Sequence, residues 1–217
     1  MGRYVPGTQS TIKKETGRLF DVNHFVYTQN KGIEMNSCLI LVDLQNDYFS
    51  GGNMELVETE KAAENAQRLL NKFRIENLPI VHIQHVSTRP GATFFVPETH
   101  GAEINEMVAP AENENVVVKN YPNSFRETSL LEILKNHNIT DVVICGAMSH
   151  MCIDATTRAA FDYGFNCIVA EDACATKDLI FKEKTIKASD VHASFMAALS
   201  APYAKIESTE EIIKSMA

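Results

Sequence analysis

Three side chains with complementary chemistry each follow a predicted buried strand. Asp43 and Lys119 end runs of apolar residues, and Cys152 comes shortly after another such run, where a helix is predicted to begin. A helix N-terminus lowers the pKa of a thiol, and its backbone N–H groups can hold a developing oxyanion. The three residues therefore offer a nucleophile, a cation that favours the thiolate and a carboxylate that moves protons, which is the equipment of nucleophilic catalysis.

The other four cysteines lack this setting. Cys38, Cys145 and Cys167 lie inside apolar runs, where a thiol is usually an inert hydrophobic group with a raised pKa. Cys174 falls in a predicted loop and is ambiguous. A single cysteine at a helix start is more often structural than catalytic, so the case for Cys152 depends on its companions. An odd number of scattered cysteines also indicates free thiols in a reducing compartment.

Each companion also has a simpler interpretation. Asp43 could cap the turn after its strand, although a carboxylate that ends a wholly apolar run and precedes Gln45-Asn46-Asp47 favours catalysis. Lys119 could be a solvated strand end, and only its place in the set argues otherwise. His150 is too near Cys152 in the chain to form a Cys–His dyad with it, because residues so close at a helix start point in different directions. We interpret His150 as a wall or structural residue.

The elements that must position these residues alternate regularly from residue 37 onward. Short apolar runs are typical of strands buried on both faces, and the segments between them show helical periodicity. Strands are predicted at 38–43, 79–85, 116–119, 141–146, 166–171 and 204–206, and helices at 59–77, 129–137, 152–163, 184–199 and 209–216. This alternation predicts an α/β fold, a three-layer sandwich with a six-stranded, mostly parallel sheet covered by helices on both faces. Ligands bind outside the carboxyl ends of such strands, where the sequence places Asp43, His85, Lys119 and Glu171.

Composition limits the partners of the protein. The chain has 217 residues, 45% of them hydrophobic, which suits one domain with a well-buried core. Its 20 Lys and Arg against 28 Asp and Glu leave a net charge of −8, which disfavours nucleic acid and anionic membrane surfaces as partners. No apolar run approaches the roughly 20 residues of a membrane helix, and the N-terminus has no apolar signal core. We therefore expect a cytoplasmic protein.

Several ordered segments together resemble the isochorismatase-like cysteine hydrolase family. They are Asp43-Leu44-Gln45-Asn46-Asp47-Tyr48-Phe49, Lys119, Asn123-Ser124-Phe125, the run from Gly146 to Ala160 that contains Cys152, and Asp172-Ala173-Cys174. The resemblance extends from about Met35 to the C-terminus. We therefore expect a hydrolase domain at 35–217, preceded by an N-terminal extension or arm at 1–34.

The resemblance implies a role for each residue of the set. Cys152 attacks an amide or similar carbonyl to form a thioester, Asp43 takes the thiol proton and later activates water, and Lys119 stabilises the charged thiolate and carboxylate. The backbone N–H groups of Met148 and Cys152 form the oxyanion hole, beside a cis peptide bond between Ala147 and Met148.

A metal site is not expected. Nicotinamidases of this family carry zinc or iron on an Asp-x-His pair and a further histidine, but the corresponding stretch here, His82-Ile83-Gln84-His85, contains no aspartate. Residues three apart on a strand face opposite sides of the sheet, so His82 and His85 cannot chelate one ion together, and His100 alone does not complete a site. We predict no metal and no cofactor.

The substrate pocket is predicted at the same edge of the sheet. The loop after the second strand is long and carries paired aromatic residues, and such loops are often lids or interfaces. An apolar loop packed against the body or against a neighbouring subunit is an equally good interpretation. Our candidates for lining the pocket are Gln45, Phe94, Phe95, Tyr121 and Phe125. The family is commonly oligomeric, and the apolar segment at 94–97 fits a homo-oligomer.

The leading hypothesis is a cysteine-dependent hydrolase that cleaves a C–N bond of a small molecule, in an amide, ureido or carbamoyl group, through a thioester. One alternative is an isochorismatase-type hydrolase of a vinyl ether, which Cys152 disfavours because that subgroup lacks the nucleophile. The other alternative is a non-catalytic binding protein on the same fold. An intact set of Asp43, Lys119 and Cys152 disfavours that alternative too.

Overall fold

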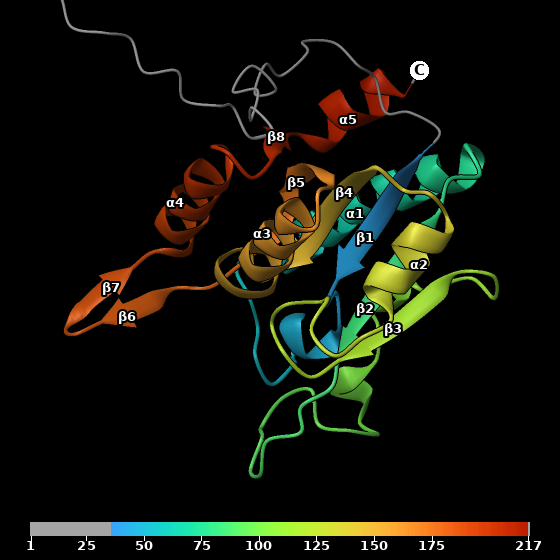
Figure 1. The fold of residues 1–217 in the computed structure, drawn as a ribbon. Helices are drawn as coiled ribbons and strands as arrows, with labels where there is room; N and C mark the ends of the chain where they lie inside the picture. Colours follow the sequence, from blue (N-terminus) through green and yellow to red (C-terminus); the bar gives the residue numbers. More distant parts are fainter. Residues whose placement is uncertain (1–35, 217) are drawn as a thin grey trace, which may run out of the picture. The chain divides into compact units, whose positions relative to one another are not determined.

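The computed structural model describes residues 36–216, and its centre is a sheet of six parallel strands (Figure 1). In chain order these strands are β1 (Ser37–Val42), β2 (Ile80–His85), β3 (Asn115–Lys119), β4 (Asp141–Ala147), β5 (Asn166–Ala175) and β8 (Lys205–Glu207). Their spatial order is β3-β2-β1-β4-β5-β8, and every pairing is parallel. The chain order runs outward in both directions from the neighbours β1 and β4, so the switch point of the sheet lies between them.

Helices cover both faces of this sheet. One face packs against α1 (Thr59–Ile75) and α5 (Thr209–Ser215), and the other packs against α2 (Leu130–Asn136), α3 (Asp154–Asp162) and α4 (Ala188–Leu199). Alternate residues of β1 divide between the two cores, because successive side chains of a strand point to opposite faces. Leu39 and Leu41 join the core with α1 and α5, whereas Ile40 and Val42 join the core with α2, α3 and α4. The predicted three-layer α/β sandwich is confirmed.

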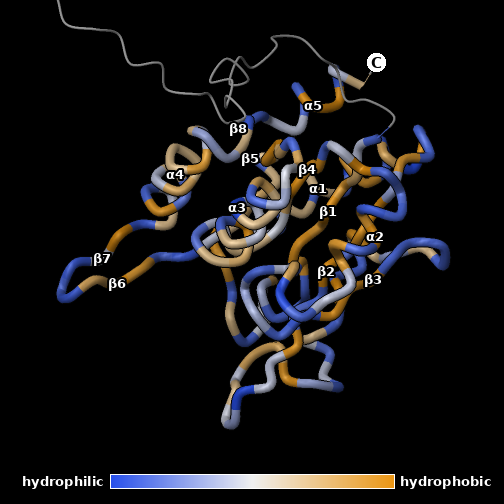
Figure 2. Tube along the Cα trace, in the orientation of Figure 1, coloured by the Kyte–Doolittle hydropathy of each residue, from blue (hydrophilic) through white to orange (hydrophobic). Residues whose placement is uncertain are grey.

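The continuous apolar runs of the sequence coincide with the central strands. All six residues of β1 are buried, and six of the seven residues of β4 are buried. The hydropathy-coloured trace shows the same concentration of hydrophobic residues along the middle of the sheet (Figure 2). Burial on both faces explains why these strands lack the polar alternation of a half-exposed strand.

A β-hairpin replaces the first part of one predicted helix. The sequence predicts a helix from about 184 to 199, but β6 (Leu179–Phe181) and β7 (Lys184–Ile186) pair antiparallel, and α4 begins only at Ala188. Lys182 adopts a positive φ of 56° and turns the chain between the two strands. The Asp178 carboxylate accepts a hydrogen bond from the Ala188 N–H at 2.8 Å and thereby closes the base of the hairpin.

The fifth strand is longer than the predicted segment 166–171. It continues to Ala175 after an irregularity in its pairing with β4, and Cys174 pairs with Gly146. The interpretation of Cys174 as a loop residue is therefore wrong. Among the described helices, none is both long and apolar enough to cross a membrane. The predicted arm at 1–34 lies outside the described residues.

Candidate active site

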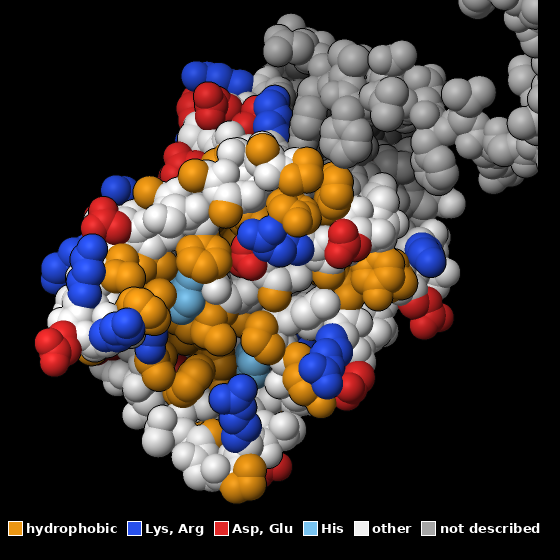
Figure 3. Space-filling model, turned by 60° about the vertical axis from the view of Figure 1, so that its left-hand side comes forward, with side chains coloured by type: hydrophobic (Ala, Val, Ile, Leu, Met, Phe, Trp, Pro, Cys, Tyr) orange, Lys and Arg blue, Asp and Glu red, His pale blue; other side chains and the backbone are white. Residues whose placement is uncertain are grey.

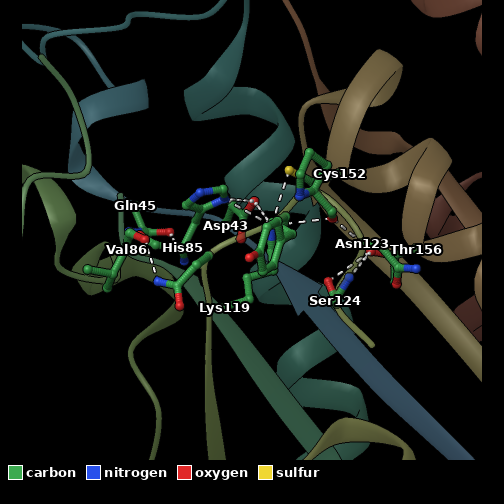
Figure 4. A network of polar contacts seen from close by, with 12 residues as sticks. Asp43, Gln45, His85, Val86, Lys119, Asn123, Ser124, Cys152 and Thr156 are labelled. Atoms are coloured by element: carbon green, nitrogen blue, oxygen red, sulfur yellow. Dashed lines mark hydrogen bonds and ion pairs between the residues drawn. The ribbon is translucent and has the colours of Figure 1, made fainter. Parts of the chain in front are cut away.

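The structure brings together the three side chains that the sequence singled out. The Nζ atom of Lys119 lies 2.8 Å from Oδ2 of Asp43 and 3.2 Å from Sγ of Cys152 (Figure 4). Asp43 follows β1, Lys119 ends β3, and Cys152 lies in the turn after β4, so all three come from carboxyl ends of strands. None of the three residues is more than 4% exposed. The cluster is a buried carboxylate–ammonium–thiol site at the switch point of the sheet.

Five electron-rich atoms surround the Lys119 ammonium. Besides Asp43 and Cys152, they are Nδ1 of His85 at 3.1 Å, the carbonyl oxygen of Tyr121 at 3.1 Å and that of Pro122 at 3.4 Å. Burial lowers the pKa of Lys119, but the negative charge of Asp43 and the hydrogen bonds to Asp43 and Cys152 raise it more, so the net pKa lies above the ordinary value. Lys119 is therefore a charged ammonium at neutral pH.

The surroundings of Cys152 favour the neutral thiol over the thiolate. Burial raises its pKa well above the ordinary value, and the adjacent Asp43 raises it further, while Lys119 offsets these effects only in part. The cysteine lies in a π-helical turn, Ser149–Ile153, and α3 begins after it at Asp154. The predicted lowering of its pKa by a helix N-terminus is therefore wrong.

The backbone around the cluster has an unusual conformation. Asp43 has a positive φ of 52°, a region that non-glycine residues adopt at an energetic cost and often at functional sites. Gly146 has a φ of 123°, and a Cβ atom placed there would lie 2.0 Å from the carbonyl oxygen of Val42. Only glycine therefore allows β4 to approach β1 just before Asp43. The Ala147–Met148 peptide bond is cis, as the resemblance implied.

The predicted oxyanion hole lies directly after that bond. Within residues 36–216, the Met148 N–H donates to no acceptor, whereas the Met148 carbonyl oxygen accepts from the N–H groups of Met151 and Ile153 at 2.9 and 3.3 Å. An unpaired N–H beside a buried thiol is suitable for holding a developing oxyanion. Cys152, whose N–H is the second predicted donor of the oxyanion hole, lies in the π-helical turn Ser149–Ile153.

Ser149 connects this turn to the body of the protein. Its Oγ donates to the Ala175 carbonyl oxygen at 3.3 Å and lies 2.9 Å from Nδ1 of His192, whose Nε2 lies 3.7 Å from Glu171. His150 points elsewhere, with Nδ1 2.6 Å from the Thr176 hydroxyl. It contacts neighbouring structure as the sequence analysis expected, rather than the thiol.

The pocket candidates at 45, 94 and 95 occupy different settings. Gln45 is fully buried and connects loops, because its side chain donates to the carbonyls of His85 and Ala102 and accepts from the His85 N–H. Phe95 is also fully buried, with its ring 4.6 Å from that of Tyr48 and 5.7 Å from that of His85. Phe94 is half-buried beside it. Phe95 therefore supports the cluster from behind His85.

The two remaining pocket candidates follow β3. The carbonyl of Tyr121 contacts Lys119, while its ring lies under the guanidinium of Arg126 at 3.6 Å. Phe125 is 6% exposed and packs in the core, with its ring 5.2 Å from that of Tyr163. Its ring also lies 6.2 Å from that of the buried Phe165, so the structure gives Phe125 a packing role.

Asp47 holds the long loop in place, a role that the sequence analysis did not assign. Its carboxylate accepts hydrogen bonds from the Phe95 N–H at 2.6 Å and from the Asn53 side chain at 2.9 Å. A Cβ atom on Gly101 would lie 2.2 Å from the same carboxylate, so the chain passes closely there. The only sign of this role in the sequence was the presence of a second acidic residue, Asp47, four positions after Asp43.

His85 also lies at the site. The sequence placed it at the carboxyl end of a strand, but it was not among the three predicted catalytic residues. It pairs with Lys119 in the register of β2 and β3, which brings its ring to the ammonium. His82 points to the other side and lies 2.9 Å from Glu114. The prediction that the two histidines face opposite sides is confirmed.

The fold and this buried cluster are those expected of an isochorismatase-like hydrolase. The comparisons with known proteins agree. The family model of the Isochorismatase domain matches residues 37–211, and the chain belongs to that family. The isochorismatase-family protein YddQ of Bacillus subtilis is 48% identical over 180 residues, which are 83% of this chain and all of that protein.

Two further relatives extend this picture. A crystal structure assigned to the isochorismatase hydrolases, from Oleispira antarctica, is 50% identical with a TM-score of 0.81, covering 85% of this chain and all of the other. A streptothricin hydrolase of Streptomyces noursei is 33% identical over 141 residues, which are 65% of this chain and 50% of that enzyme. The family is thus one of hydrolases.

Proposed function

We propose that the protein is a cysteine-dependent amidohydrolase that cleaves a C–N bond in an amide, ureido or carbamoyl group of a small molecule. The observation that carries this proposal is the position of Lys119, whose ammonium contacts both Asp43 and Cys152 inside a buried site. A carboxylate, a cation and a thiol in mutual contact match the needs of a base, an electrostatic stabiliser and a nucleophile.

The reaction begins with transfer of the thiol proton from Cys152 to the carboxylate of Asp43. Ligand atoms of these two residues lie within 4.8 Å of each other, so a small side-chain movement is sufficient. The sulfur forms a bond to the carbonyl carbon, and the π electrons move to the oxygen, where the N–H groups of Met148 and Cys152 hold the oxyanion. Its collapse breaks the C–N bond, and the leaving nitrogen takes the proton from Asp43.

Hydrolysis of the thioester restores the site. Water loses a proton to Asp43 and adds its oxygen to the thioester carbon, which forms a second oxyanion. Collapse of this oxyanion breaks the C–S bond, releases the acid, and returns the proton from Asp43 to the Cys152 sulfur. Lys119 remains an ammonium throughout and balances the negative charge as it moves between carboxylate and sulfur.

Two other functions fit less well. Vinyl ether hydrolysis of the isochorismatase type is consistent with the family name, but it leaves the buried thiol of Cys152 without a role. A binding protein without catalysis is consistent with the fold, but it leaves a buried ion pair unexplained. The relative that hydrolyses streptothricin supports a hydrolase of small molecules.

The test is a screen for released ammonia or amine with primary amides, ureido and carbamoyl compounds and lactams. We expect turnover by the wild type and by Cys167→Ser, because Cys167 lies in β5 and donates to the Phe165 carbonyl oxygen at 3.5 Å. We expect no turnover by Cys152→Ala. Substantial activity of Cys152→Ala would show that Cys152 is not the nucleophile. Release of pyruvate from isochorismate would favour the vinyl ether alternative.

We further propose that the enzyme is a cytoplasmic homo-oligomer without nucleic acid or membrane partners. All five cysteines are free and buried, which suits a reducing compartment. The face with the β6–β7 hairpin gathers hydrophobic side chains (Figure 3). Ile180 and Phe181 on that hairpin are 77% and 67% exposed, so the hairpin is our candidate for the contact between subunits. The segment 94–97, for which the sequence suggested such a contact, is less suitable because Phe95 is fully buried.

A further inference from the structure

Three side chains of the active site also have the composition of a zinc site. Asp43, His85 and Cys152 each place one ligand atom within 4.8 Å of the others. Among residues 36–216 no second group of three His, Cys, Asp or Glu side chains is so compact. Carboxylate oxygen, imidazole nitrogen and thiolate sulfur are the donors that Zn²⁺ takes in proteins. The His85 side chain is only 19% exposed and that of Asp43 is fully buried, so the donors are already largely withdrawn from water.

The Lys119 ammonium occupies the centre of these donors. Its Nζ lies 2.8 Å from Asp43, 3.1 Å from His85 and 3.2 Å from Cys152. The carbonyl oxygens of Tyr121 and Pro122 complete the surroundings at 3.1 and 3.4 Å. Five electron-pair donors around one positive charge form a cage for a cation, and the chain fills it with its own ammonium.

We propose that Asp43, His85 and Cys152 form an inhibitory zinc site that the Lys119 ammonium keeps closed in the working enzyme. Zn²⁺ binds the Asp43 carboxylate, Nδ1 of His85 and the Cys152 sulfur, and water completes the coordination. The thiol loses its proton to solvent as the sulfur–zinc bond forms, and the Lys119 side chain leaves the centre with its charge.

Once Lys119 has left, the three ligands require only a small adjustment. Zinc bonds of about 2.0–2.3 Å in a tetrahedron place the ligand atoms about 3.3–3.7 Å apart. Nδ1 of His85 and Oδ2 of Asp43 are 3.9 Å apart, and the third ligand atom lies within 4.8 Å of both. Shifts of about 1 Å close the set, which is within the reach of side-chain rotation at a half-buried histidine.

This site shares His85 with the stretch that corresponds to the nicotinamidase Asp-x-His pair, but it takes its other two ligands from Asp43 and Cys152. His82 takes no part, because its Nε2 faces Glu114 at 2.9 Å on the other side of the strand. Metal at the new site would occupy the proposed nucleophile and the proposed base together. Inhibition therefore rests on the proposed function, whereas metal binding itself does not.

The test uses Co²⁺ as a spectroscopic probe of the zinc site, with the folded full-length protein and no substrate. Lys119→Ala removes the ammonium and should bind one Co²⁺ roughly tenfold or more tightly than the wild type, with a thiolate-to-cobalt charge-transfer band that Zn²⁺ abolishes. Adding Cys152→Ser should remove the band, and adding His85→Gln should weaken binding by roughly tenfold or more. Adding Cys167→Ser, a matched buried thiol, should change neither.

Three results would overturn the proposal: no tighter binding by Lys119→Ala, a band that survives Cys152→Ser, or an affinity that His85→Gln leaves unchanged. If Lys119→Ala does not fold, the wild type decides the question at Zn²⁺ concentrations high enough to compete with the Lys119 ammonium, which makes binding weaker but not absent. Zn²⁺ should then protect Cys152 from alkylation, and His85→Gln should abolish that protection. A protein that binds cobalt in this way and hydrolyses no C–N compound would keep the metal site and lose the proposed activity.

Discussion

Lys119 and Asp43 form an ion pair of 2.8 Å between two side chains that solvent does not reach. The charge of the carboxylate raises the pKa of the neighbouring Cys152 thiol, and the ammonium lowers it. The two partners therefore act in opposite directions on the same sulfur. These opposing effects leave the pKa of Cys152 raised, and in the proposed mechanism Asp43, the base for the thiol proton, already contacts Lys119, the stabilising cation.

Replacing Lys119 with methionine should cost both stability and activity. The change leaves the Asp43 charge buried without a partner, for which we expect a loss of about 3–5 kcal/mol in the free energy of unfolding, measured by urea denaturation. Lys187→Met serves as a control, because the Lys187–Asp178 pair is exposed, and it should leave the urea midpoint unchanged. A midpoint for Lys119→Met equal to that of the wild type would show that the buried pair contributes nothing.

Asp43→Asn should make the thiol more reactive while abolishing turnover. Asn keeps the shape of the side chain and tolerates the positive φ at this position, but it removes the charge that raises the Cys152 pKa. With Lys119 alone beside the sulfur, the apparent pKa of iodoacetamide alkylation should fall by at least about one unit. The wild-type rate should still rise with pH above 9, because burial and Asp43 keep the thiol protonated. A wild-type plateau near pH 7 would contradict this account.

Gly146→Ala should disrupt the approach of β4 to β1. The added Cβ would lie 2.0 Å from the Val42 carbonyl oxygen at a φ of 123°, so we expect a loss of more than about 3 kcal/mol and loss of activity. Gly91→Ala is the matched control. Gly91 also has a positive φ, 77°, but nothing lies within 4 Å of the added atom, and we expect a loss of only about 1 kcal/mol. Equal unfolding midpoints of the two variants would refute the steric argument.

Glu114 should make the fold sensitive to acid. Burial raises its pKa, but hydrogen bonds from Arg74, the Ala111 N–H and His82 lower it more, to about 2 from an ordinary 4.5. The folded state therefore gains stability from the ionised carboxylate above pH 4.5 and loses it as the pH falls towards 2. Glu114→Gln should lower the unfolding free energy at pH 7 by about 2–3 kcal/mol and flatten its decline between pH 4.5 and 2, as read from unfolding curves at several pH values. If the free energy of unfolding fell equally with pH in the wild type and in Glu114→Gln, the acid sensitivity would arise from groups other than Glu114.

The β6–β7 hairpin should carry the contact between subunits. An isolated two-stranded hairpin is marginally stable in water, and Ile180 and Phe181 leave most of their surface exposed on it. We expect light scattering to find an oligomer for the wild type and a smaller species for Ile180→Lys combined with Phe181→Glu. Ile75→Lys, at the equally exposed end of α1, should keep the wild-type mass. A monomeric wild type would exclude the oligomer.

Local patterns predicted the sheet well and the hairpin poorly. Buried parallel strands give continuous apolar runs, so the strand positions could be recognised from residue types alone. The segment before Ala188 was assigned to a helix because the following residues have helical periodicity, and the turn at Lys182 carries neither glycine nor proline to mark it. The register irregularity that places Cys174 opposite Gly146 has no local signal either, because it depends on the neighbouring strand.

The sequence by itself determined the fold class, the family resemblance and the three residues Asp43, Lys119 and Cys152, because residue type and short-range periodicity carry that information. Only the tertiary structure decided what surrounds them. Strand order and register bring His85 to within 3.1 Å of Lys119, and burial reverses the expected direction of the Cys152 pKa shift. Distances between residues that lie far apart in the chain, and the removal of water around them, arise only when the sheet is assembled.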